Sequence, residues 1–265
     1  MNYIQAVILA IIEGITEFLP VSSTGHMIIA SSFFRIAHDD FTKLFTIVIQ
    51  LGTILSVVVL YFKRFFQSLD FYLKIAVAFV PAVFFGLLFA KKIDALLENP
   101  ITVAISLIIG GIILLKVDEW FSTSDDSTDN QTISYSTAFK IGLIQCLAMV
   151  PGVSRSGASI VGGMTQKLSR KTAAEFSFFL AVPTMLGATL KKCYDYYKDG
   201  FVLSSDQINF LIIGNVLGFV VALFAIKTFI NYLSKNGFKI FGYYRIIAGI
   251  LVLLIHFFVQ KLTII

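Results

Sequence analysis

Six long apolar runs constrain the fold of this chain more than any other feature. They span Leu44–Phe62, Ile75–Ala90, Ile101–Leu115, Thr172–Leu190, Phe210–Ile226 and Tyr243–Val259. A helix needs about 20 mostly apolar residues to cross a bilayer. Flanking Lys and Tyr side chains can extend the shorter runs by reaching toward the membrane surface. The sequence therefore predicts six transmembrane helices.

The composition excludes a soluble protein. Of the 265 residues, 57% are hydrophobic and 14% are charged, whereas soluble domains contain about 25% charged residues. The net charge of +5 does not indicate nucleic-acid binding, because Lys and Arg cluster at the ends of the apolar runs, where they set topology or contact lipid headgroups. We expect membrane lipids as partners, and no nucleic acid.

Two further apolar segments are interrupted by Pro, Gly and Ser. Tyr3–Phe18 breaks at Leu19–His26 and resumes to Phe34, and Ala138–Val150 breaks at Pro151–Gly157 and resumes as Ala158–Met164. Each limb is too short to cross a bilayer, and the breaks exclude a continuous helix. We expect two re-entrant hairpins that enter and leave the membrane on the same side.

Matching stretches reveal an internal repeat. Ser22–Gly25 resembles Ser154–Gly157, Leu88–Ala90 matches Leu223–Ala225, and Ile109–Ile112 resembles Ile247–Ile250, with displacements of 132, 135 and 138. Each half holds one hairpin and an odd number of spans, so the second half must be inverted. The sequence predicts an all-α integral membrane protein. Its single domain, 1–265, would contain two inverted repeats, about 1–117 and 138–265, joined by a solvated acidic loop at 118–137.

The basic residues predict the orientation. Twelve Lys and Arg residues, including Lys63, Arg64 and Arg245, fall near segment ends on one side, against eight on the other. The richer side is expected in the cytoplasm, so that both termini face outward.

Four charged or titratable residues lie within or beside the two breaks: Glu13, Glu17, His26 and Arg155. A charge in hydrocarbon costs at least about 2.5 kcal/mol, so such residues usually have partners or a function. Glu13 and Glu17 share one helix face and repel each other. A shared proton, a divalent cation or Arg155 would relieve this repulsion.

Each break also precedes a short helical limb. Unpaired N–H groups at a helix N-terminus bind anions, and the hydroxyls of Ser22, Ser23, Ser154 and Ser156 stand at these two positions. Helix capping alone would explain the serines. It would not explain Arg155, whose guanidinium matches a phosphate group. We therefore expect an anionic ligand, with phosphate the best match. Gln50, inside an apolar run, either hydrogen-bonds this site or links helices.

The residues of the breaks resemble a known family. Residues 13–26 (EGITEFLPVSSTGH) and 151–157 (PGVSRSG) are similar to the two signature motifs of the bacterial undecaprenyl-diphosphatase family, also called the bacitracin-resistance protein. The resemblance covers essentially the whole chain. It implies an enzyme of the bacterial cell membrane that removes the terminal phosphate of undecaprenyl diphosphate. The product, undecaprenyl phosphate, is the carrier that peptidoglycan synthesis reuses.

The resemblance also implies roles for individual residues. Those implied to be catalytic are Glu13, Glu17, Ser23 and His26. The diphosphate would contact Ser22, Ser154, Arg155, Ser156 and Ser159, although the family often has Thr at the last position. Glu13 and Glu17 would hold a divalent cation, Mg²⁺ or Ca²⁺, and the site would open toward the periplasm. A homodimer is compatible with this assignment.

Several alternatives stay open at this stage. The nucleophile is His26, Ser23 or a water molecule activated by Glu17, and we favour His26 with Glu17 orienting it. His26 is otherwise a structural histidine. A transporter or flippase would equally use inverted repeats and broken helices, whereas a structural membrane protein would leave the four titratable residues unexplained.

Overall fold

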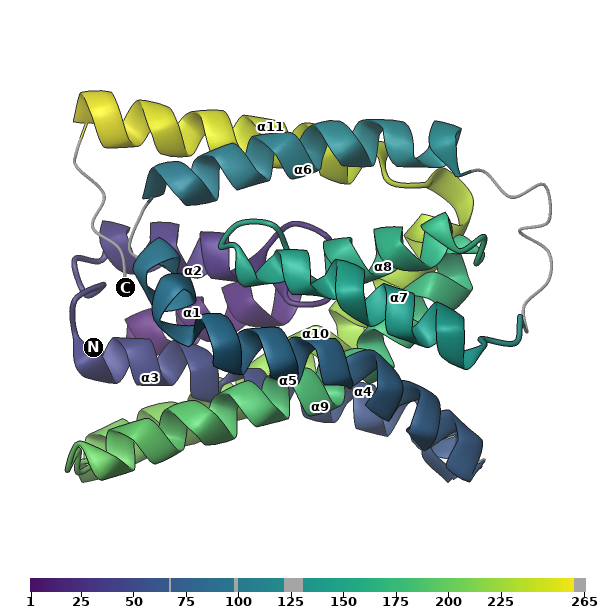
Figure 1. The fold of residues 1–265 in the computed structure, drawn as a ribbon. Coiled ribbons are helices and arrows are strands. Elements are labelled where there is room, and N and C mark those ends of the chain that lie inside the picture. Colours follow the sequence, from purple (N-terminus) through teal and green to yellow (C-terminus); the bar gives the residue numbers. More distant parts are fainter. Residues whose placement is uncertain (67, 98–99, 122–130, 260–265) are drawn as a thin grey trace.

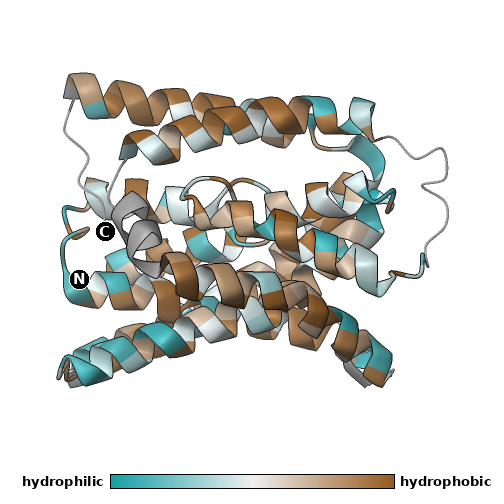
Figure 2. Ribbon diagram, viewed as in Figure 1, coloured by the Kyte–Doolittle hydropathy of each residue, from teal (hydrophilic) through white to brown (hydrophobic). Residues whose placement is uncertain are grey.

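The computed structural model describes residues 1–66, 68–97, 100–121 and 131–259, which form helices and connecting turns and contain no strand. Six helical segments are long and apolar enough to cross a membrane. They are α3 (Asp40–Val48) with α4 (Gln50–Leu60), α5 (Leu69–Leu97), α6 (Pro100–Trp120), α9 (Arg170–Lys198), α10 (Ser205–Asn236), and α11 (Lys239–Leu254) with the π-helical turn Ile255–Val259. All six predicted spans are confirmed as apolar helices, and the chain is a multi-pass membrane protein. Apolar residues cover the middle of these helices and polar residues gather at both ends (Figure 2).

The two interrupted segments form helix–break–helix units. In the first, α1 (Tyr3–Thr16) is followed by α2 (Ser23–Phe33). In the second, α7 (Tyr135–Gln145) continues as the short 3₁₀-helix Cys146–Met149 before α8 (Arg155–Thr165) begins. Both breaks are present but shorter than predicted, because Ser23–His26 already belong to α2 and Arg155–Gly157 to α8.

Helices from the two halves of the chain pack against one another. α1 contacts α10, whereas α7 contacts α5, and α4 lies against α9. α6 and α11 form a separate pair along one side of the molecule (Figure 1). The breaks after α1 and α7 thus lie inside a bundle to which both halves contribute.

Glycines bring these helices into close contact. A Cβ atom added at Gly111 in α6 would lie 2.8 Å from the carbonyl oxygen of Gly242 in α11, and one at Gly249 would lie 2.7 Å from that of Ala104. Between α4 and α10, the Gly52 N–H donates to Asn215 Oδ1 at 2.8 Å. Small residues permit such backbone approaches between membrane helices.

The expected acidic loop is shorter than the sequence suggested. α6 extends to Trp120 and therefore includes Asp118 and Glu119. Asp118 is not solvated, because its carboxylate accepts from Arg170 Nε at 2.7 Å and from the Phe238 N–H at 2.8 Å. The other acidic residues of this stretch, Asp125, Asp126 and Asp129, lie outside the described residues.

Candidate active site

The two breaks meet in the middle of the bundle. Arg155 Nη2, at the start of α8, donates to Glu17 Oε1, which follows α1, at 2.9 Å. The Ser156 hydroxyl donates to the carbonyl oxygen of Leu19 at 2.7 Å. These contacts join residues 138 and 137 positions apart. The predicted approach of Arg155 to the acidic pair is therefore present for Glu17.

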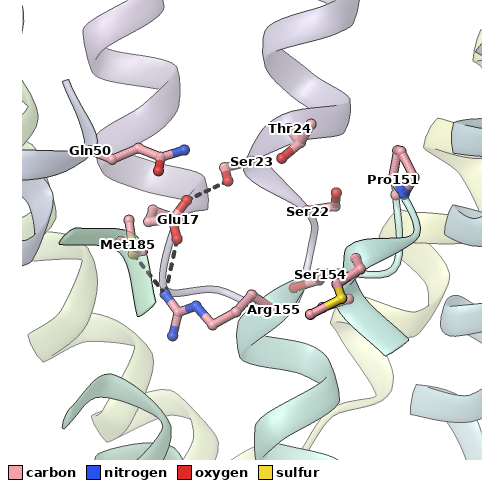
Figure 3. Close-up of a pocket in the computed structure, with 12 residues that line it drawn as sticks. Glu17, Ser22, Ser23, Thr24, Gln50, Pro151, Ser154, Arg155 and Met185 are labelled. Atoms are coloured by element: carbon pink, nitrogen blue, oxygen red, sulfur yellow. Dashed lines mark hydrogen bonds and ion pairs between the residues drawn. The ribbon is translucent and has the colours of Figure 1, made fainter. Parts of the chain in front are cut away.

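A cavity of about 220 Å³ lies at this junction. Its lining comes from both breaks, from α9 and from the α3–α4 segment (Figure 3), and consists of Glu17, Ser22, Ser23, Thr24, Gln50, Ala148, Met149, Pro151, Gly152, Ser154, Arg155 and Met185. Five of the predicted site residues line it: Glu17, Ser22, Ser23, Ser154 and Arg155. Gln50 also lines the cavity, as expected if its side chain contributes to this site.

Arg155 is held from several sides. Besides Glu17, its guanidinium donates to the Ser177 carbonyl at 3.1 Å and to Met185 Sδ at 3.4 Å, and it lies 5.6 Å from the centre of the Phe18 ring. Its Nε is buried and has no hydrogen-bond partner within the described chain. A charged group with a weak sulfur acceptor and an unused donor can bind an added anion.

Glu17 uses both carboxylate oxygens. Oε1 accepts from Arg155, and Oε2 accepts from the Ser23 hydroxyl at 2.5 Å (Figure 3). A hydroxyl that already donates to a carboxylate can pass its proton there while its oxygen attacks an electrophile. Ser23 and Glu17 are thus hydrogen-bonded inside the cavity, which is the geometry that a nucleophile and its base require.

Glu13 lies one helical turn before Glu17 and does not line the cavity. It is 1% exposed, and neither carboxylate oxygen has a hydrogen-bond partner among the described residues. A buried ionised carboxylate without partners is strongly unfavourable, so a proton or a cation must accompany Glu13. The neighbouring oxygen donors, Glu17 and the Ser23 hydroxyl, are of the type that Mg²⁺ and Ca²⁺ prefer. Within the described residues no group of three or more His, Cys, Asp or Glu side chains gathers in one place.

The residues that precede α2 and α8 have matching conformations. Ser22 and Ser154 have left-handed φ angles of 70° and 76°. Each side chain caps its helix, accepting from the N–H of Gly25 at 3.4 Å and of Gly157 at 3.1 Å. Such a conformation is uncommon for residues other than glycine and is typical of functional sites.

His26 does not line the cavity. Its Nδ1 is 2.8 Å from the Ser22 carbonyl oxygen, which requires that nitrogen to be the donor. Nε2 is 2.5 Å from the hydroxyl of Tyr244 in α11, and the two rings stack. In this arrangement the ring is directed at α11, and its expected catalytic role stays a prediction.

Ser156 and Ser159 lie behind the cavity and are fully buried. The Ser156 hydroxyl joins the two breaks through Leu19 and lies 3.1 Å from the Ser154 hydroxyl. The Ser159 hydroxyl donates to the Arg155 carbonyl at 2.8 Å and lies 2.6 Å from Ser177 Oγ. Both serines support cavity residues in this structure without facing the cavity, and their expected contact with the diphosphate stays a prediction.

Arg245 is the main residue that the sequence analysis misplaced. The sequence predicts it among the basic residues at the membrane surface. The structure buries it instead, because its side chain is 1% exposed and donates to carbonyl groups of both breaks. Its position in the sequence could have indicated burial, because it lies inside the last apolar run, two residues after Tyr243. Tyr244, the partner of His26, was missed as well.

Comparisons with known proteins agree with the resemblance of the two motifs. Residues 6–251 match the family described as "Bacitracin resistance protein BacA". A protein of Flavobacterium psychrophilum named "Undecaprenyl-diphosphatase" is 78% identical over 265 residues, which cover all of both chains. Proteins with the same name from Flavobacterium johnsoniae and Porphyromonas gingivalis are 77% and 51% identical. The first alignment covers both chains completely, and the second covers 94% of this chain and 95% of the relative.

The Ser156→Ala variant tests the junction between the breaks. It removes one of two donors to the part-buried Leu19 carbonyl, which also accepts from the Val21 N–H at 2.8 Å. The loss of one such hydrogen bond costs about 0.5–1.5 kcal/mol, so the thermal unfolding midpoint in detergent should fall. Ser234→Ala is the matched control, because the Ser234 hydroxyl bonds only within α10 and is exposed. Equal midpoints for the two variants would contradict the structural importance of the Ser156 contact.

Proposed function

Because this chain belongs to the bacitracin resistance protein BacA family, we propose that its central cavity hydrolyses undecaprenyl diphosphate. The reaction releases the terminal phosphate and leaves undecaprenyl phosphate, the lipid carrier used again in peptidoglycan synthesis. The observation that carries this proposal is the contact of Arg155 with Glu17, and of Glu17 with Ser23, inside one cavity. An anion-binding group, a base and a nucleophile are thereby brought together.

Arg155 and the two helix starts form the proposed diphosphate site. The guanidinium exchanges its contact with Glu17 for phosphate oxygens, which it binds in a bidentate manner. The helices α2 and α8 begin directly after their N-cap residues Ser22 and Ser154, and their N-termini favour negative charge. Ser154 hydroxyl and Thr24 line the same cavity and offer further donors.

We propose Ser23 as the nucleophile, since it faces the cavity and His26 does not. Its oxygen forms a bond to the terminal phosphorus while the bond from phosphorus to the bridging oxygen breaks. The serine proton passes to Glu17, and undecaprenyl phosphate leaves with the bridging oxygen. Water then cleaves the phosphoserine, giving inorganic phosphate. His26 supports this arrangement through the Ser22 carbonyl.

A divalent cation, Mg²⁺ or Ca²⁺, fits the oxygen donors of this site. Neither Glu13 oxygen has a hydrogen-bond partner among the residues described, and Glu17 lies one helical turn away, so these two carboxylates would hold the ion. When bound, it would neutralise negative charge on the diphosphate. In its absence, a proton shared by the two carboxylates would relieve their repulsion.

We also propose that the two halves are inverted repeats with re-entrant hairpins. The helix contacts support this. In the proposed repeat α1 corresponds to α7 and α5 corresponds to α10, and α1 packs on α10 as α7 packs on α5. The shared left-handed caps at Ser22 and Ser154 support it as well. In this arrangement the chain is one membrane domain, the termini face outward, and the cavity opens toward the periplasmic side of the bacterial cell membrane.

Phosphate release from a polyprenyl diphosphate tests the proposed activity. The purified protein in detergent should release inorganic phosphate, and a chelator should suppress the release. Glu17→Ala should reduce the rate by at least about 100-fold, because it removes the base and the partner of Arg155. A wild-type protein that binds the lipid but releases no phosphate would instead favour a transporter or flippase.

Arg155→Lys tests whether the guanidinium binds the diphosphate in a bidentate manner. An ammonium group cannot form two parallel hydrogen bonds, and a lost charge-assisted bond of about 1.5–3 kcal/mol corresponds to a KM raised about 10- to 100-fold. Arg64→Lys is the control, because Arg64 pairs with Glu175 at 3.4 Å outside the cavity. Steady-state kinetics with wild-type KM in Arg155→Lys would contradict diphosphate binding by this residue.

Rapid quenching followed by mass spectrometry identifies the nucleophile. We expect phosphoserine at residue 23, and its loss in Ser23→Ala. A phosphohistidine at residue 26 would instead support the interpretation first drawn from the sequence, and the absence of any phosphorylated residue under single-turnover conditions would favour a water molecule activated by Glu17.

A further inference from the structure

Arg245 is a buried guanidinium that contacts both breaks and α6 at once. It extends from α11 and is 1% exposed. Within the described residues, all of its hydrogen bonds go to backbone carbonyl oxygens: Pro20 at 3.0 Å, Ser106 at 3.1 Å, Leu107 at 3.3 Å, Gly152 at 2.8 Å and Val153 at 2.9 Å. Three of these five acceptors belong to the breaks that line the cavity.

No carboxylate of the described residues pairs with this side chain. None of the ion pairs among the described residues includes Arg245. A buried guanidinium with only neutral acceptors keeps a net positive charge in a region of low dielectric constant. That charge lies directly behind Gly152, which lines the cavity, and so favours an anion there.

The carbonyl contacts also fix the direction of the peptide groups. In a trans peptide the C=O and the following N–H point in opposite directions. Because the Val153 carbonyl faces Arg245, the N–H of Ser154 is directed away from the guanidinium. This peptide leads directly into Ser154, whose φ is 76°. The Pro20 carbonyl in the first break is held by the same Nη1 atom, so one group aligns both loops.

The surrounding sequence accommodates this guanidinium. A Cβ atom added at Gly110 in α6 would collide with Arg245 Nη2, so glycine is needed there. The preceding residue, Tyr244, contacts His26 in the first turn of α2. Two consecutive residues of α11 therefore hold the break between α1 and α2.

We propose that Arg245 is a positioning residue for the diphosphate site. It aligns the two breaks through their carbonyl groups and supplies uncompensated positive charge behind them. It does not touch the substrate. The inference rests on the proposed function, because it assigns this role to the same cavity. Lysine cannot replace it, since three donors on one nitrogen cannot reach five carbonyls spread over α6 and both breaks.

The test compares Arg245→Lys, Arg245→Met and Gly110→Ala with the wild type. Steady-state phosphate release should show KM raised about tenfold or more in Arg245→Lys, and further in Arg245→Met, which also removes the charge. Gly110→Ala retains the arginine but displaces it, and should raise KM as well. Arg170→Lys is the control, because Arg170 forms a part-buried ion pair with Asp118 away from the cavity and should keep wild-type KM.

A second measurement separates this proposal from the proposed activity. Inorganic pyrophosphate should raise the thermal unfolding midpoint of the wild type and of Arg170→Lys, and should shift Arg245→Lys much less at the same concentration. This holds even if the wild type hydrolyses no lipid. The proposal is overturned if pyrophosphate stabilises Arg245→Lys and the wild type equally, if it stabilises neither, or if Arg245→Lys loses folded protein while the remainder keeps wild-type KM.

Discussion

The ion pair between Arg155 and Glu17 joins two chain segments that are 138 positions apart, and the rest of the site depends on it. Opposite charges buried together relieve part of their desolvation cost, but such a pair contributes little net stability. A pair of this kind is easily exchanged for another anion. In the proposed reaction the diphosphate takes the place of Glu17 at Arg155, and Glu17 becomes available to accept the Ser23 proton. The interaction that closes the fold would thus also prepare the base.

The two breaks are possible because other groups satisfy their backbones. A chain that leaves helical geometry inside a membrane protein exposes carbonyl and N–H groups that have no water to bind. The Ser22 and Ser154 hydroxyls accept hydrogen bonds from N–H groups of the following helices. Arg245 donates hydrogen bonds to carbonyl groups of both breaks. The glycines between α6 and α11 allow these two helices to approach closely enough for Arg245 to reach both loops. Helix packing and site geometry are therefore coupled through a single side chain.

The predicted site residues fall into those that line the cavity and those that lie outside it. Glu17, Ser23 and Arg155 face it, whereas Ser156 and Ser159 lie behind it and His26 is directed at Tyr244. This division agrees with a site in which one layer binds and reacts while a second layer fixes the first. Glu13 occupies a third position, buried next to Glu17, and neither of its oxygens has a hydrogen-bond partner in the part of the chain that the structure describes. Its charge state is consequently the part of the site most sensitive to a bound cation or proton.

The sequence by itself determined the six apolar helices and the positions of the two breaks, and it predicted five of the residues that line the cavity. Apolar runs give transmembrane helices because the bilayer tolerates little else, and Pro and Gly mark the two breaks. Titratable residues in such a setting, among them Glu17 and Arg155, indicate function because burying them is costly. Tertiary structure alone decided which side chains face the cavity, since helical spacing cannot distinguish Ser23 from His26 without the position of α11. It also decided the place of Arg245, because one arginine near the end of an apolar run predicts a membrane surface until the packing of α6 against α11 directs it inward.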